Sequence, residues 1–239
     1  MGPVRTPVKQ VPPEKERLRM SYEEFLAWAD EDVHAEWVNG EVIIHVPPKD
    51  IHQNLVRFLA VLLDLYVQFF RLGQLRFAPF EMKLAPDGPS RQPDILFVAK
   101  EHLERLTEDR LIGPADLVVE VVSADSVRRD LVEKFSEYER YGVREYWLVD
   151  SRPGRRGAEF WVRDEEGRFQ AADVGEEGVY RSTVVPGFWL RLAWLQADPL
   201  PDPLLTFAEM VGFPPEAMAA LRDLAAKGPR AVGAEASRQ

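Results

Sequence analysis

The sequence predicts an α/β (α+β) fold in which a mixed β-sheet is flanked by helices. Three short apolar runs, residues 95–98, 117–122 and 145–149, predict buried strands. An amphipathic segment over residues 125–142 predicts a helix between the last two strands. Shorter antiparallel strands on either side complete the pattern of a mixed sheet covered by helices.

Length and composition are those of a globular domain with extensions. The chain has 239 residues, of which 46% are hydrophobic and 29% charged, enough to bury a substantial core. The absence of cysteine excludes a thiolate zinc site, a disulfide scaffold and thiol catalysis. The net charge of −10 is unlike that of proteins that coat nucleic acid without specificity. Any nucleic acid would therefore be bound through a local basic patch or with the help of a metal ion.

No segment is expected to cross a membrane. Residues 1–19 are basic and proline-rich and lack the apolar centre of a signal peptide. The longest apolar stretch, residues 51–72, is interrupted by Arg57, Asp64 and Arg71 and so predicts a buried helix. We expect a cytoplasmic protein.

The N-terminal part predicts an arm, a short helix and a hairpin. Residues 1–20 contain four prolines and should form a flexible arm. Ser21-Tyr-Glu-Glu24 has the pattern of a capping box and should begin a helix that runs to about Ala29. Asn39-Gly40 suits a type I′ turn in a hairpin over residues 36–44.

A long helix, a strand and a turn are expected next. Asp50 should cap the long apolar helix, which should end at Gly73. Residues 77–84 predict a strand and residues 86–89 a turn.

The C-terminal part predicts short strands, a helix and a tail. The strands are expected at residues 160–162, 169–171 and 180–184. Residues 204–226 have a helical pattern. The main domain should span residues 21–195, followed by a helical extension over 196–226 and a disordered tail over 227–239.

Two acids interrupt or adjoin strands that are otherwise apolar. Asp94 stands at the entry to the first buried strand, and Glu120 lies in the middle of the second. A buried carboxylate needs a hydrogen bond, a cation or a metal ion. If the two strands are neighbours, both carboxylates could hold Mg²⁺ or Mn²⁺, which prefer oxygen ligands. Alternatively, Asp94 is a turn residue and Glu120 is paired with an arginine.

The helix after Glu120 carries a polar stripe. Asp130, Lys134, Tyr138 and Tyr141 recur at helical spacing and so share one face. Lys134 could point back to the carboxylate pair and orient a water or stabilise charge on a phosphate. Alternatively, Asp130 and Lys134 form an ordinary surface ion pair.

These motifs resemble the bacterial Uma-two family, whose members are similar to restriction endonucleases of the PD-(D/E)XK superfamily. The resemblance rests on Pro93-Asp94, the stretch Asp116–Ser123, Arg129-Asp130 with Glu133-Lys134 and Tyr138, and the string Gly142–Asp150. It extends to Tyr22, Phe25, Glu36, Asn39-Gly40-Glu41 and His52-Gln53, and covers residues 21–195.

The resemblance implies a restriction-endonuclease-like core and a set of site residues. Asp94 and Glu120 match the metal-binding acids, with the Val121 carbonyl as a third ligand of Mg²⁺ or Mn²⁺. The superfamily usually places its lysine two residues after the second acid, where this chain has Val122. Lys134 on the following helix is the candidate replacement.

Further residues could support this site. Glu36 matches an acid that the superfamily supplies from its N-terminal element, although it could simply begin the hairpin. His52 could act as a base or as an ordinary hydrogen-bonding residue, and Gln92 could touch a phosphate or only belong to the loop. Asp130 could support the site, and Tyr138 is expected to pack or to orient Lys134. Trp147 is expected in the core.

The most direct interpretation is a Mg²⁺-dependent phosphodiesterase that hydrolyses DNA and uses no organic cofactor. The candidate basic contacts lie within residues 5–19 and at Arg128, Arg129, Arg152, Arg155 and Arg156. One alternative is a module on the same fold that binds nucleic acid or protein without cleaving it. Another is a hydrolase of a smaller phosphoester.

We also expect a homodimer. The apolar residues of the stretch 59–70, including Phe69-Phe70, exceed what one sheet face needs. A thick two-layer core could instead absorb them.

Overall fold

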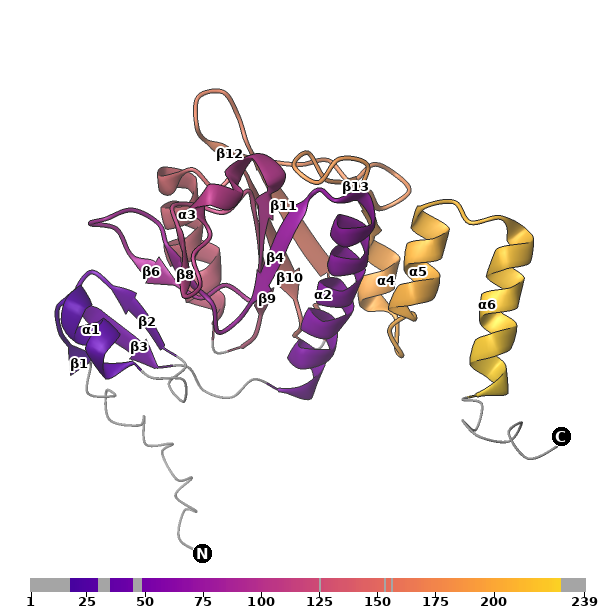
Figure 1. Cartoon of the computed structure of the whole chain (residues 1–239), viewed down its shortest axis with the longest axis horizontal. Coiled ribbons are helices and arrows are strands. Elements are labelled where there is room, and N and C mark those ends of the chain that lie inside the picture. Colours follow the sequence, from indigo (N-terminus) through magenta and orange to yellow (C-terminus); the bar gives the residue numbers. More distant parts are fainter. Residues whose placement is uncertain are drawn as a thin grey trace, which may run out of the picture.

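A central six-stranded sheet organises the chain (Figure 1). The computed structural model describes residues 18–29, 35–44, 49–124, 126–152, 154–155 and 157–228. In spatial order the strands are β12 (Phe169–Ala171), β11 (Gly157–Arg163), β10 (Glu145–Asp150), β9 (Leu117–Val122), β7 (Ile95–Ala99) and β4 (Gly73–Phe77). Only β9 and β10 are parallel, so the predicted mixed sheet and its three buried strands are confirmed.

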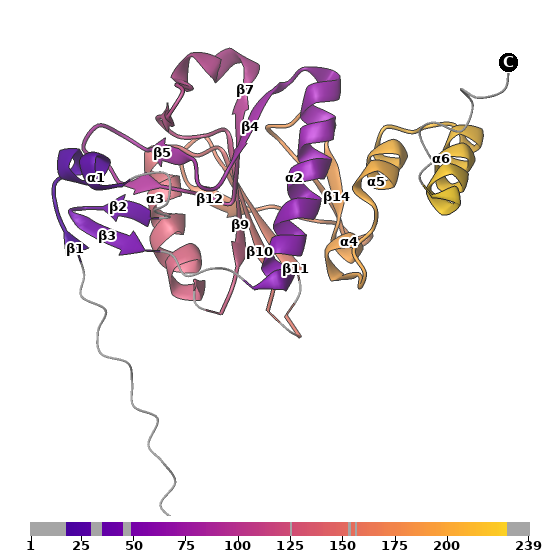
Figure 2. The same cartoon turned by 60° about the horizontal axis from the view of Figure 1, so that its bottom comes forward.

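Helices cover both faces of this sheet. Helix α2 (Asp50–Phe70) lies on one face, where its buried residues recur at helical spacing from Leu55 to Val67 (Figure 2). Of the helices in the described ranges, α2 alone has the length and hydropathy that a membrane span requires. Eight of its residues are buried, as expected for a core helix.

The opposite face is covered by a helix that changes type along its length. Residues Arg129–Lys134 form a π-helix, η2, which continues as α3 (Phe135–Tyr141). It ends at Gly142, which adopts a left-handed conformation with φ of 96°. Asp125, the first residue of the predicted helical segment, lies outside the described residues.

A second sheet lies beside α3 and carries the N-terminal elements (Figure 1). Its strands are β1 (Leu18–Arg19), β3 (Glu41–Ile44), β2 (Ala35–Val38), β6 (Ser90–Arg91), β5 (Glu81–Lys83) and β8 (Arg110–Ile112). Helix α1 (Tyr22–Trp28) begins with the predicted capping box of Ser21 and Glu24. The hairpin turn is also confirmed, since Asn39 and Gly40 have positive φ values of 50° and 86°.

Several predicted boundaries were wrong. The cap of α2 is Lys49, and Asp50 is its first residue. The helix ends at Phe70 with Arg71 in a left-handed conformation, and Gly73 begins β4, where a Cβ atom would lie 2.1 Å from the carbonyl oxygen of Val98.

Two further segments differ from their predicted form. Residues 77–84 are not one strand, because β4 ends at Phe77 and β5 begins at Glu81. Leu18–Arg19 forms β1 rather than part of a flexible arm; residues 1–17 and 229–239 lie outside the described residues.

The C-terminal segment forms separate helices instead of one. After the small β13 (Val179–Arg181) and β14 (Trp189–Arg191) sheet come α4 (Leu192–Gln196), α5 (Pro203–Met210) and α6 (Pro215–Lys227). Pro214 caps α6 and so separates it from α5.

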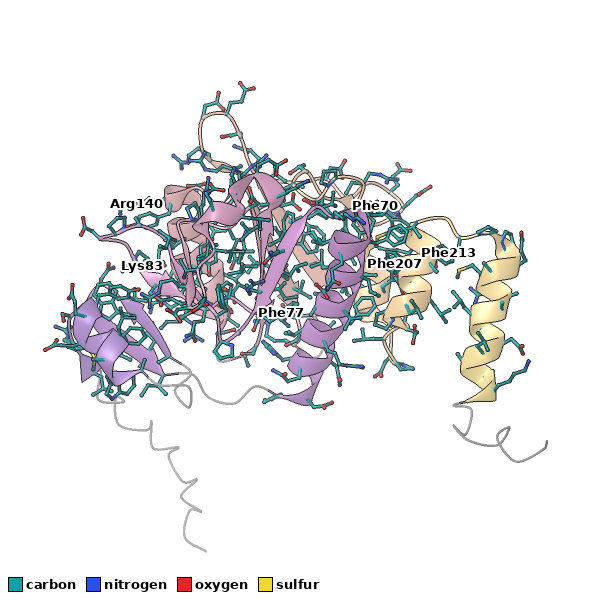
Figure 3. The ribbon with its side chains drawn as sticks, viewed as in Figure 1. Phe70, Phe77, Lys83, Arg140, Phe207 and Phe213 are labelled. Carbon is teal, nitrogen blue, oxygen red and sulfur yellow. The ribbon has the colours of Figure 1, made fainter. Side chains whose placement is uncertain are left out.

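Some of the apolar side chains of α2 that do not face the central sheet are covered by α5. The rings of Phe69 and Phe207 lie 5.4 Å apart and those of Phe207 and Phe213 6.4 Å apart; Figure 3 labels Phe207 and Phe213 at this end of the molecule. The observation that suggested a homodimer is therefore explained in part within one chain.

Glu145, at the start of β10, is buried and binds donors from a distant loop. Its side chain accepts hydrogen bonds from the Trp147 indole at 2.6 Å, the Thr183 amide at 2.8 Å and the Thr183 hydroxyl at 2.7 Å. Ser182 and the Val184 amide complete the set. This carboxylate therefore fixes the loop after β13 against the central sheet.

Replacing Glu145 by Gln should destabilise the fold by about 2–3 kcal/mol, because an amide NH₂ would face donors that now share a carboxylate. Denaturant unfolding measures the change. Glu176→Gln, at an exposed position, is the matched control and should have almost no effect. Equal stability of the two variants would contradict this role of Glu145.

Candidate active site

Asp94 contacts β9 beside Glu120, at the point where β7 begins. Strands β7 and β9 are antiparallel neighbours, and their last pair is Ile95 with Val119. Asp94 therefore stands next to the part of β9 that continues past β7. There its Oδ2 accepts the amide N–H of Val121 at 2.7 Å.

The Val121 carbonyl lies at the same edge of β9. The N–H and C=O groups of one strand residue point toward the same neighbouring strand. Because the N–H of Val121 is bound to Asp94, the carbonyl oxygen of Val121 faces the edge where β7 has ended. The Val121 carbonyl and the Asp94 carboxylate thus lie at the same edge of β9, and Glu120 is the residue before Val121.

The π-helix η2 brings Lys134 to Glu120. The Lys134 Nζ lies 2.7 Å from Glu120 Oε1, 3.3 Å from Glu36 Oε1 and 3.6 Å from Asp130 Oδ1. The lysine side chain is only 3% exposed, so the Asp130–Lys134 contact is a buried pair rather than a surface pair. The Tyr138 hydroxyl donates to Glu120 Oε1 at 2.9 Å, so it orients the acid and not the lysine.

Arg91 links the second sheet to this cluster and was not foreseen from the sequence. It is fully buried, and its guanidinium donates to Glu36 at 3.0 Å and to both oxygens of Glu137 at 2.7 and 2.8 Å. The only signal for it is its place in the strand just before Asp94. Glu36 is not merely the start of a strand, because it contacts both Arg91 and Lys134.

His52 and Gln92 flank the acids. His52 Nε2 lies 3.3 Å from Asp94 Oδ2, and the backbone N–H of Gln92 donates to Glu36 Oε1 at 3.0 Å. His52 Nδ1 and Gln92 Oε1 are buried, and neither has a hydrogen-bond partner within the described ranges. Such atoms are rare in a protein interior, and both can form a hydrogen bond to a ligand of the site.

The cluster carries more negative than positive charge. Among the described residues, its carboxylates belong to Glu36, Asp94, Glu120, Asp130 and Glu137, whereas its permanent cations are Arg91 and Lys134. This surplus makes an added cation favourable.

Burial and charge shift the titration of the central pair. Burial raises the pKa of Glu120 to about 8; Lys134 opposes this shift, and Asp130, Asp94 and Glu36 add to it. Burial would lower the pKa of Lys134, but the carboxylates around it outweigh this effect and raise the pKa. The lysine is therefore a permanent ammonium ion.

The residues present fit a hard divalent cation. Within the described ranges, no group of three or more His, Cys, Asp or Glu side chains is arranged to hold a metal. An ion here would therefore take two carboxylates, of Asp94 and Glu120, with the Val121 carbonyl, water and phosphate oxygens as its other ligands. Mg²⁺ and Mn²⁺ accept such a set, since Mg²⁺ usually keeps several waters.

The candidate arginines are placed differently from one another. The Arg128 side chain is 89% exposed, whereas the Nε of Arg129 is buried without a partner in the described part of the chain. Arg152 forms a short ion pair with Asp150, and Arg155 is exposed. Arg156 lies outside the described residues.

Comparison with known proteins places this architecture in a family. Residues 22–193 match the Uma2 family, described as "Putative restriction endonuclease", which is the Uma-two family of the sequence resemblance. A similar solved structure is that of a "putative nuclease belonging to DUF820" from Anabaena variabilis ATCC 29413. The two share 16% sequence identity with a TM-score of 0.60 over 74% of this chain and 97% of that one, a likeness that shows the fold alone. No curated protein matches. Since the match covers most of its length, the chain belongs to the Uma2 family of restriction-endonuclease-like proteins.

Proposed function

We propose that this chain is a metal-dependent endonuclease that hydrolyses phosphodiester bonds in DNA. One observation carries the proposal: the Lys134 ammonium lies 2.7 Å from Glu120, beside the edge where Asp94 binds Val121. Together, Asp94, Glu120 and Lys134 would provide oxygen ligands for a cation and a positive charge for a phosphate. Membership of a restriction-endonuclease-like family supports a nuclease.

Asp94, Glu120 and the Val121 carbonyl would hold Mg²⁺ or Mn²⁺. When bound, the cation would polarise the scissile phosphate and lower the pKa of a water ligand. The Val121 amide orients Asp94, and Tyr138 orients Glu120.

Lys134 would act on the phosphate or on the attacking water. Its ammonium keeps its proton because three carboxylates surround it. It can therefore donate a hydrogen bond to a water or balance the charge that develops on the phosphate oxygens. Glu36 and Asp130 would position it, and Arg91 would in turn position Glu36.

The substrate and the assembly state are part of the same proposal. DNA would be bound by exposed arginines near the site, such as Arg128 and Arg155, and a homodimer would offer one site to each strand. A non-catalytic module is the main competitor, because the Glu120–Lys134 contact could also serve only as a structural ion pair.

Asp94→Asn, Glu120→Gln and Lys134→Met should each reduce metal-dependent DNA cleavage by about a hundredfold or more. The assay follows supercoiled plasmid and single-stranded DNA with Mg²⁺ or Mn²⁺. Asp223→Asn, which changes an exposed acid of α6, is the control and should keep full activity. If wild type cleaves DNA and all three variants cleave it equally well, the assignment of these residues is contradicted.

The pH dependence of stability separates an active site from a structural ion pair. The pKa of Glu120 is raised from 4.5 to about 8 in the fold. Protonation of this carboxyl therefore stabilises the metal-free fold fully below about pH 4.5, and this contribution is lost as the pH rises through 8. Glu120→Gln removes the charge but can still accept hydrogen bonds from Lys134 and Tyr138. The metal-free variant should thus melt about 3 °C or more above wild type at pH 8, with a smaller difference at pH 5.

The second part of this experiment measures the effect of metal on the melting temperature. Mg²⁺ or Mn²⁺ should raise the melting temperature of wild type by binding only the folded state, and should not raise that of Glu120→Gln. Glu145→Gln is the matched control: it should lower stability at both pH values and keep the metal effect. A lower melting temperature for Glu120→Gln at pH 8, with no metal effect in wild type, would favour the structural ion pair.

A further inference from the structure

A hollow adjoins the candidate active site on the same face of the central sheet. It has a volume of about 230 Å³, and its lining includes Val122, Leu148 and Gly157 from three adjacent strands. Leu148 is the register partner of Glu120, and Val122 follows Glu120 by two residues on β9. Side chains of register partners, and of residues two apart in a strand, lie on one face. The hollow therefore lies on the same face of the sheet as the Glu120 carboxylate and beside it.

The absence of a side chain at Gly157 leaves this space open. Gly157 pairs with Asp150 in β11 and so faces the same side of the sheet. A Cβ atom at position 157 would meet only the Arg155 carbonyl oxygen, at 3.8 Å, which is ordinary contact. A larger residue could therefore be placed here without strain and would occupy the hollow.

The lining combines apolar surfaces with a fixed guanidinium group. Leu131, on the π-helix next to Asp130, lines the hollow and remains 37% exposed. Arg152 is held by Asp150, whose Oδ1 accepts its Nε at 2.9 Å and whose Oδ2 accepts its Nη2 at 2.6 Å. A guanidinium plane and aliphatic side chains are surfaces on which a nucleobase packs.

Charged groups around the hollow suit the rest of a nucleotide. Arg155 lines it and is exposed, so it can meet a phosphate group. The carboxylates of Asp150 and Glu159 can accept hydrogen bonds from base amino groups. The volume is below that of pockets for drug-sized ligands, so the hollow fits one ring system.

We propose that this hollow binds one unpaired nucleobase of a DNA strand, in the nucleotide next to the scissile phosphate. The inference rests on the proposed nuclease function and specifies its substrate class. Both faces of a base in a duplex are covered by its stacked neighbours, so a base reaches such a hollow only after leaving the stack. The preferred substrates are therefore single strands, flaps or locally unpaired DNA rather than intact duplex.

The test measures binding without metal, so that it does not depend on cleavage. A fluorescent single-stranded oligonucleotide is titrated with the full chain, in parallel with its duplex and with an abasic strand of the same length. Wild type should bind the intact single strand about tenfold more tightly than either of the other two. Gly157→Val should lose this preference while its melting temperature stays unchanged. Ala171→Val, at an exposed position of the adjacent β12, is the matched control and should bind like wild type.

Three outcomes would overturn the inference. The first is equal binding of duplex and single strand, and the second is unchanged binding by Gly157→Val. The third is displacement of the oligonucleotide by an equal concentration of thymidine monophosphate, which would show that the hollow binds a small nucleotide. The proposed function fails separately: if wild type shows the single-strand preference but cleaves no DNA with Mg²⁺ or Mn²⁺, the hollow is a binding site without nuclease activity.

Discussion

The buried ammonium of Lys134 is the charge on which the arrangement of the site depends. It contacts Glu36 of the second sheet, Glu120 of the central sheet and Asp130 of its own helix. A carboxylate buried without a partner costs several kcal/mol, so each of these three segments is stabilised by facing the lysine. Lys134 thus ties the two sheets and the π-helix together at the point where Asp94 reaches β9.

The charges of the same cluster do not balance, as they would in a purely structural ion network. A stable buried ion network would balance its charges, but among the described residues of this cluster the carboxylates outnumber the cations Arg91 and Lys134. The raised pKa of Glu120, which burial and the neighbouring acids cause, expresses this imbalance. Buried like charges among otherwise apolar strands lower the stability of the fold. Such an arrangement is typical of functional sites.

Much of the fold could be predicted from local patterns. The buried strands follow from apolar runs, the start of α1 from the Ser21–Glu24 box, and the hairpin from Asn39-Gly40. Asp94, Glu120 and Lys134 could be named as candidates because acids in apolar strands and a polar helical stripe are visible in a single sequence, and the contact of Lys134 with Glu120 agrees with that stripe.

The remainder depends on contacts between distant segments. Arg91 lies 46 residues from Glu137 and 55 from Glu36, and no local pattern connects them. Most donors of Glu145 likewise come from tertiary contacts, since Ser182, Thr183 and Val184 are far from it in the sequence. The ends of α2 were misplaced because Asp50 and Gly73 suit helix ends by residue type, whereas the close approach of β4 to Val98 determines the place of Gly73.

The most direct test of a cation at the Asp94–Glu120 edge is the anomalous scattering of crystals grown with Mn²⁺. The account predicts one strong peak about 2.0–2.6 Å from a carboxylate oxygen of Asp94 and one of Glu120, with the Val121 carbonyl as a further ligand and the Lys134 ammonium still beside Glu120. A map with no peak at this edge at millimolar Mn²⁺, or with a peak bound only by other residues, would contradict it.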